Sequence, residues 1–148
     1  MGPLLLLNGP NLNLLGTREE HLYGAESLKK IEGRVQHKAK KLGYELICLQ
    51  SNHEGVLIDA IQKEGSKSVG VIINPGGFGH SSVAIRDALI AINRPVVEVH
   101  ITNLAKRESF RQHTLISDIS IGYIAGFGSI GYELACDALN DHLRSRSS

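Results

Sequence analysis

The sequence predicts an α/β fold in which five parallel strands form one sheet and helices cover both of its faces. Short apolar runs alternate along the chain with longer segments of helical period, and the connections between them are short. Regular alternation of this kind requires right-handed crossovers between parallel strands. The apolar runs are continuous, as expected of strands that are buried on both faces.

The first strand and the first helix are predicted by the apolar pattern near the N-terminus. Residues 4–7 are consecutive leucines, and an Asn-Gly-Pro turn follows them. Over residues 27–42 the apolar positions recur at helical spacing, and Gly43 stands where a helix commonly ends.

The same alternation recurs in the middle of the chain. Residues 44–49 predict the second strand. Ser51 and Glu54 have the spacing of a capping box, which predicts a helix that continues to about Glu64. Residues 69–73 predict the third strand, since an Asn-Pro-Gly-Gly turn ends this apolar run.

The remaining elements complete the sheet and its cover. Residues 83–92 have a helical period, residues 95–100 predict the fourth strand, residues 120–125 the fifth, and residues 130–143 a last helix. The 148 residues, 1–148, therefore form a single domain, whose length is that of one ordinary globular unit.

Composition excludes several classes of protein. With 42% hydrophobic and 21% charged residues, a packed core is expected and disorder is not. The net charge is +1 without blocks of like charge, so nothing indicates nucleic-acid binding. No apolar run approaches the ~18 residues that a membrane span requires, and no signal-peptide pattern begins the chain. We therefore expect a cytoplasmic protein that binds no membrane.

Two possible ligand motifs are weak. Gly126 to Gly131 fits G-x-G-x-x-G, but too few residues follow for the strand that such a motif requires, so we interpret it as a tight turn. The seven histidines form no His-x-x-x-His pair, and Cys48 and Cys136 lie in separate apolar stretches. We expect no metal and no cofactor, and two reduced cysteines in the core.

Polar residues gather in the loops that follow the strands. Ligands of parallel sheets bind beyond the carboxyl ends of the strands, which here means residues 8–24, 51–52, 74–82 and 100–114. These loops contain Asn11, Arg18, Tyr23, Asn74, His80, His100, Asn103, Arg107 and Arg111. Each has an ordinary alternative as a turn residue, a solvated charge or a packing ring. Their convergence at one edge of the sheet nevertheless predicts a site.

Several long segments resemble those of type II 3-dehydroquinate dehydratases. The matching segments are 5–16, 18–19, 23–24, 50–55, 73–76, 80–89, 98–100, 107–108, 110–111 and 122–128. They occur in the same order and span essentially the whole chain, which makes the resemblance specific. The flavodoxin-like fold of that family agrees with the alternation of strands and helices.

The resemblance implies a hydro-lyase that converts 3-dehydroquinate to 3-dehydroshikimate by a reversible anti elimination through an enolate, without a cofactor. This reaction serves aromatic amino acid biosynthesis through the shikimate pathway, or quinate breakdown. Tyr23 matches the proton acceptor, and Arg18 and Arg107 are the cations that favour its phenolate. Asn11 matches the group that stabilises the enolate through a held water.

His100 matches the acid that protonates the departing hydroxyl. Glu98 lies two residues earlier on the same strand, so the two side chains share a face and the carboxylate can hold the imidazole. The alternative for Glu98 is a surface carboxylate at the end of a strand. Substrate binding is implied for the side chains of Asn74, His80 and Arg111 and for the backbone N–H groups of Ile101 and Thr102.

Asp87 is implied to reach the site of a neighbouring subunit, because members of this family assemble as dodecamers of trimers. The alternative is a salt bridge to Arg86 within the subunit. The chain departs from the common family pattern at Glu20, Phe78, Gly79, Ser81 and Thr102. Losing the usual proline at position 20 predicts a less rigid lid, but no departure removes a proposed chemical group.

Two other functions remain open. A catalytically silent module on the same fold could use its arginines to bind a small anion. A flavin or nucleotide redox protein is suggested by the fold and by the turn at Gly126.

Overall fold

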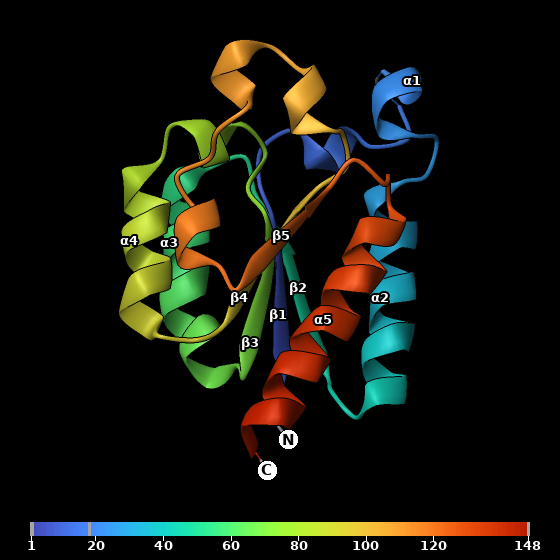
Figure 1. Cartoon of the computed structure of the whole chain (residues 1–148). Helices are drawn as coiled ribbons and strands as arrows, with labels where there is room; N and C mark the ends of the chain where they lie inside the picture. The colour runs from blue at the N-terminus through green and yellow to red at the C-terminus, as the bar shows by residue number, and fades with distance from the viewer. Residues whose placement is uncertain (1, 18, 148) are drawn as a thin grey trace.

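The computed structural model describes residues 2–17 and 19–147 and has three layers (Figure 1). The middle layer is one parallel sheet with the strand order β2-β1-β3-β4-β5. Its strands are β1 (Leu4–Asn8), β2 (Leu46–Gln50), β3 (Gly70–Asn74), β4 (Val96–His100) and β5 (Gly122–Ala125). This arrangement confirms the predicted fold.

Helices cover both faces of the sheet in pairs. One face carries α2 (Leu28–Leu42) and α5 (Ile130–Ser147), and the other carries α3 (Glu54–Lys63) and α4 (Val83–Ile92) (Figure 1). A short helix, α1 (Glu20–Tyr23), and several 3₁₀ turns lie at the edge where the strands end.

The leucines of β1 explain why the apolar runs are continuous. Leu4 and Leu6 pack into the core beneath α2 and α5, whereas Leu5 and Leu7 pack into the second core beneath α3 and α4. All are fully buried, because successive residues of a strand point to opposite faces and helices cover both faces here.

The predicted boundaries differ from the structure by a few residues, and one predicted cap is wrong. The Ser51 hydroxyl accepts a hydrogen bond from the His53 N–H, two residues on, and α3 begins only at Glu54. The Glu54 carboxylate accepts instead from the Ser82 hydroxyl at the start of α4. The last helix is also longer than predicted and ends at Ser147.

The glycine-rich segment after β5 has the conformation of a tight turn. Gly126 and Gly128 have φ angles of 96° and 69°, which glycine adopts without strain. Their N–H groups donate to the carbonyls of His100 and Ile101. The turn therefore fixes the end of β4, where a predicted site residue lies.

Both cysteines are free thiols, as predicted. Cys136 is fully buried, and Cys48 is partly buried against the same core. Burial raises the pKa of Cys48 to about 12 and that of Cys136 to about 11. Within the described residues, no helix is long and apolar enough to cross a membrane, and no cluster of His, Cys, Asp or Glu could hold a metal ion.

A β-carbon at Gly9 would collide with the loop after β3, so we expect Gly9→Ala to destabilise the protein. The new carbon would lie 2.2 Å from the Pro75 carbonyl oxygen, and the Gly9 N–H donates to the Asn74 carbonyl at 2.8 Å. Urea unfolding should show a loss of about 1–3 kcal/mol. Gly33→Ala is the control, because nothing lies near that exposed helical glycine and alanine should stabilise it by up to about 1 kcal/mol. Equal stability of the two variants would contradict the close approach of these loops.

Candidate active site

The predicted site residues meet in a cleft at the carboxyl ends of β1, β3 and β4. This cleft has a volume of about 160 Å³. Its lining includes Asn11, Tyr23, Asn74, His80, His100, Ile101, Thr102, Arg107 and Arg111. Arg18 lies outside the described residues. Glu98 lies beneath the cleft, and Asp87 lies outside it on α4.

His100 and Glu98 form a buried pair at the end of β4. The His100 Nε2 and the Glu98 Oε2 are joined by a hydrogen bond, and the exposed fractions of the two residues are 5% and 0%. Glu98 is therefore not the surface carboxylate of the alternative interpretation. The second oxygen, Oε1, accepts hydrogen bonds from the hydroxyls of Thr114 and Ser117.

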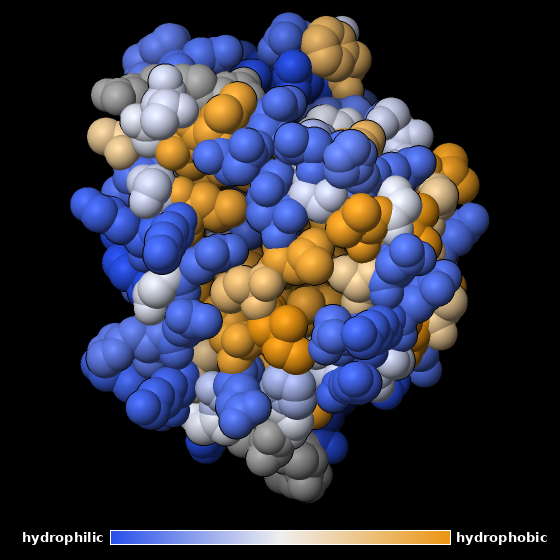
Figure 2. Space-filling model, turned by 180° about the vertical axis from the view of Figure 1, so that it is seen from behind, coloured by the Kyte–Doolittle hydropathy of each residue, from blue (hydrophilic) through white to orange (hydrophobic). Residues whose placement is uncertain are grey.

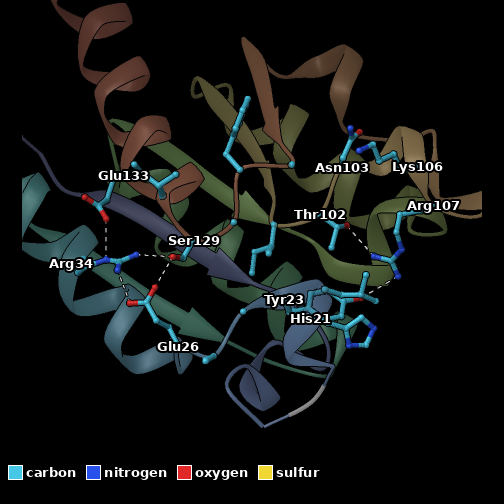
Figure 3. A pocket seen from close by; sticks show the side chains of 18 residues that line it. His21, Tyr23, Glu26, Arg34, Thr102, Asn103, Lys106, Arg107, Ser129 and Glu133 are labelled. Atoms are coloured by element: carbon cyan, nitrogen blue, oxygen red, sulfur yellow. Dashed lines mark hydrogen bonds and ion pairs between the residues drawn. The ribbon is translucent and has the colours of Figure 1, made fainter.

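Tyr23 is held against a guanidinium on the other side of the cleft. The Arg107 Nη2 donates to the Tyr23 hydroxyl oxygen at 3.2 Å, while its Nη1 donates to the Thr102 hydroxyl at 2.9 Å (Figure 3). Burial lowers the pKa of Arg107, but its hydrogen bond to Tyr23 and its interaction with the Glu108 carboxylate outweigh burial, so the pKa is raised overall. Arg107 therefore supplies a permanent positive charge beside the phenol oxygen.

Asn74 is oriented from below by Tyr132 of α5. The Asn74 Nδ2 donates to the Tyr132 hydroxyl at 2.8 Å, and this hydroxyl donates to the Asn8 Oδ1 at 2.6 Å. The Gly76 N–H donates to the remaining Asn74 oxygen at 3.2 Å. Because Asn8 and Asn74 are neighbours across β1 and β3, Tyr132 joins the ends of the two central strands.

Asn11 lies on the loop after β1 in a left-handed conformation with a φ angle of 69°. Its N–H donates to the Asn52 side chain at 3.0 Å, and Gln50 donates to the Gly9 carbonyl at 3.1 Å. The loop between β2 and α3 therefore holds the loop after β1, which brings Asn11 to the cleft. This backbone also matches the interpretation of Asn11 as a turn residue.

His80 has a defined orientation next to His100. Its Nδ1 lies 2.8 Å from the carbonyl oxygen of His113, which can only accept, so Nδ1 carries the hydrogen. The two imidazole rings are stacked with their centroids 6.4 Å apart. Gly79 is buried beside them, and a β-carbon there would lie 2.7 Å from the Pro75 ring.

Two other predicted polar residues make local contacts. The Arg111 Nε donates to the Glu108 carboxylate at 3.2 Å, while Arg111 also lines the cleft. Asn103 caps the 3₁₀ turn Leu104–Lys106, because its Oδ1 accepts from the Ala105 N–H.

Asp87 faces solvent on α4, and its predicted local partner has another contact. Arg86 donates to the Asp118 carboxylate and to the Leu115 carbonyl, so the alternative salt bridge between Arg86 and Asp87 does not form in this structure.

Val83 and Ile90 are 58% and 51% exposed, although both are apolar. They lie on the same face of α4 as Asp87, four residues before it and three after it.

A larger cavity of about 640 Å³ lies behind Tyr23 and Arg107 (Figure 3). The charged groups in its outer part pair with one another, since Arg34 contacts both Glu26 and Glu133. A hydrogen bond from Ser129, together with Arg34, holds the pKa of Glu26 below its usual range. The smaller cleft is the better candidate, because it contains a buried acid–base pair and a phenol beside a cation.

The main residues that the sequence did not identify lie beneath the cleft. Tyr132 follows the helical period of a core residue, and Thr114 and Ser117 belong to a polar loop without regular spacing. The sequence indicated a role near the cleft only for Thr114, because this residue ends the predicted site loop 100–114.

Comparisons with known proteins agree on one family. Residues 2–140 match the model of the family described as "Dehydroquinase class II". The chain is 56% identical over 135 residues to the Aspergillus flavus protein named catabolic 3-dehydroquinase 2, covering 91% of this chain and 90% of that protein. It is 52% identical over 144 residues to the 3-dehydroquinate dehydratase of Prochlorococcus marinus, covering 97% of each. The structure of the type II dehydroquinase of Butyrivibrio crossotus is similar with a TM-score of 0.90 and 42% identity, over 94% of this chain and 97% of that one.

Removing the Tyr132 hydroxyl should destabilise the protein, because Asn8 and Asn74 would each lose a buried hydrogen-bond partner. We expect Tyr132→Phe to lower the free energy of unfolding by about 1–3 kcal/mol in urea titrations. Tyr44→Phe is the matched control, since the partly exposed Asn140 that it leaves behind can bind water. A loss no larger than that of the control would show that Tyr132 does not join the strand ends.

Proposed function

The chain belongs to the class II dehydroquinase family and is a 3-dehydroquinate dehydratase, and we propose that the cleft at the carboxyl edge of its sheet carries out the elimination. This membership favours the dehydratase over the anion-binding module and the redox protein. The reaction serves the shikimate pathway or the catabolic quinate pathway. One observation supports the assignment of the site. Tyr23 and His100 line the same small cleft, where Tyr23 contacts the Arg107 guanidinium and His100 is hydrogen-bonded to the buried Glu98 carboxylate.

Elimination of water beside a ketone needs a base for the C–H proton and an acid for the departing hydroxyl. We assign the base to the Tyr23 phenolate, which Arg107 stabilises by charge and by a hydrogen bond at 3.2 Å. Arg18, on the same loop of the sequence as Tyr23, is proposed to add a second positive charge. The proton moves from carbon to the phenolate oxygen, and the electron pair of the C–H bond becomes the enolate.

The enolate then breaks down with the help of His100. As the ketone re-forms, the electrons expel the hydroxyl group and a C=C bond appears. His100 donates its proton to this hydroxyl, which leaves as water, and Glu98 holds the imidazole in position through its Oε2. Asn11 stabilises the enolate oxygen through a water molecule, since its loop holds the side chain at the cleft.

The remaining cleft residues are proposed to bind the substrate. Asn74 and His80, both held by hydrogen bonds to the protein, and Arg111 bind the ring hydroxyls. The backbone N–H groups of Ile101 and Thr102, just beyond the end of β4, bind the carboxylate.

We also propose that the protein is a homo-oligomer, a dodecamer that is built from trimers. In this assembly Asp87 reaches the cleft of a neighbouring subunit. The exposed Val83 and Ile90 on either side of Asp87 support this role, because burying them against another subunit is favourable. On the side of the molecule opposite to β5, further apolar side chains gather amid hydrophilic surface (Figure 2). A cytoplasmic location is consistent with two free cysteines.

Tyr23→Phe should abolish most turnover, because the phenyl ring retains the shape of tyrosine but has no oxygen to accept the proton. We expect kcat to fall by roughly 10²–10⁴-fold with little change in KM. The measurement is the absorbance of the conjugated product formed from 3-dehydroquinate. Tyr123→Phe, the same change on the exposed edge strand β5, serves as control. A Tyr23→Phe enzyme as fast as the parent would remove Tyr23 from the reaction.

Mixing two inactive variants tests the contribution of Asp87 from a neighbouring subunit. We expect Asp87→Asn and Tyr23→Phe each to be poorly active, and activity to return when the two are unfolded together and refolded. In mixed oligomers, a subunit with an intact Tyr23 can receive Asp87 from its neighbour. Light scattering reports the assembly size of each sample. Assembly without any recovery of activity would contradict the shared site.

A further inference from the structure

We propose that Thr114 and Ser117 are positioning residues for the elimination, which together hold Glu98 so that it keeps His100 protonated and correctly aimed. We call these two residues the hydroxyl clamp. The inference rests on the proposed function, since it assigns a purpose to residues that contact the acid without touching the substrate. The inference concerns Oε1 of Glu98, the carboxylate oxygen that is not bonded to the His100 imidazole.

The first step of the argument is the burial of Glu98. Its exposed fraction is 0%, so water cannot stabilise the carboxylate, and every lone pair needs a partner from the protein. His100 satisfies Oε2. Thr114 and Ser117 satisfy Oε1, with hydroxyl oxygens 3.0 Å and 2.8 Å away.

The second step is the direction of the hydrogen bonds. The Thr114 hydroxyl oxygen accepts from the N–H groups of Ser117 at 3.1 Å and Ile116 at 3.4 Å, so its own hydrogen must point elsewhere. This hydrogen points either to Glu98 or to the Ser117 hydroxyl oxygen, which lies 2.6 Å away. In the second arrangement the Ser117 hydroxyl donates its own hydrogen bond to Glu98. In both arrangements Oε1 accepts at least one hydrogen bond.

The consequence concerns the proton between Glu98 and His100. An oxygen that accepts hydrogen bonds favours the ionised carboxylate, and a carboxylate at Glu98 favours the proton on the imidazole. The clamp also fixes the rotation of the carboxylate, because Oε1 is tied to the loop before β5. His100 is thereby ready to act as the acid.

The backbone around the clamp is itself fixed from two sides. The Leu115 N–H donates to the Gly79 carbonyl at 2.8 Å, and the Arg86 guanidinium donates to the Leu115 carbonyl at 2.8 Å. The clamp therefore joins the loop of His80 to the buried pair. The other ionisable groups around His100 are His80, Tyr23, Arg107 and Arg111, which share the cleft with it.

Kinetics over a range of pH test the clamp. We expect Ser117→Ala and Thr114→Val to lower kcat about tenfold each, with KM nearly unchanged, because hydrogen bonds to charged groups are lost. The descending limb of the kcat profile at high pH should move to higher pH, because a carboxylate that has lost a hydrogen bond holds the proton that it shares with His100 more tightly. Thr114→Ser, which retains the hydroxyl, should restore the parent profile.

The control is Ser120→Ala on the same segment, whose hydroxyl donates to the Ile116 carbonyl and not to Glu98. It should leave kcat and the profile unchanged. A Ser117→Ala enzyme with the parent's high-pH limb would overturn the proposal, even if its kcat or stability were lower. Ser117→Ala carries the test alone if Thr114→Val does not fold.

A measurement without substrate separates this proposal from the proposed function. Proton NMR of the parent should show a downfield imidazole N–H signal that disappears in Glu98→Gln. We expect the signal to shift in Ser117→Ala but not in Ser120→Ala, whether or not the protein turns over 3-dehydroquinate. A signal that stays in place in Ser117→Ala would overturn the clamp, whereas absent turnover by the parent would overturn only the catalytic assignment.

Discussion

The arrangement of the cleft depends on a carboxylate that has no access to water. Glu98 lies in the middle of β4, where its charge is stable only if neighbouring groups donate to both oxygens. Those donors come from the same strand and from the loop that precedes β5. The hydrogen bonds that Glu98 requires therefore fix both the His100 imidazole and the polar loop that contains Thr114 and Ser117, without any ligand.

The fold could be predicted because burial on two faces leaves a simple pattern. Four leucines in a row have no polar face, so they suit only a strand covered on both sides, and β1 is that strand. The cap at Ser51 could not be predicted, because its hydroxyl satisfies a nearby N–H while Glu54 bonds to another helix. Spacing alone does not reveal which of two possible partners a polar side chain will have.

The site was predictable where the sequence carried long motifs and unpredictable where distant residues cooperate. The motifs led to Tyr23 and His100, and the topology explains why they share a cleft. Tyr132 was missed because a helical tyrosine at a core position gives no sign that its hydroxyl reaches the strand ends. The proposed environment of Asp87 involves a second chain, and a single sequence holds no pattern that reports such a contact.

The bridge made by Tyr132 has a consequence for the order of events during synthesis. Asn8 leaves the ribosome near the beginning of translation, whereas Tyr132 belongs to the final helix and is among the last residues to emerge. The nascent chain can pair its strands early, but the side chains of Asn8 and Asn74 are bridged only when α5 docks on the sheet. A chain released prematurely would thus contain nearly every group of the cleft and still lack the support that aligns them.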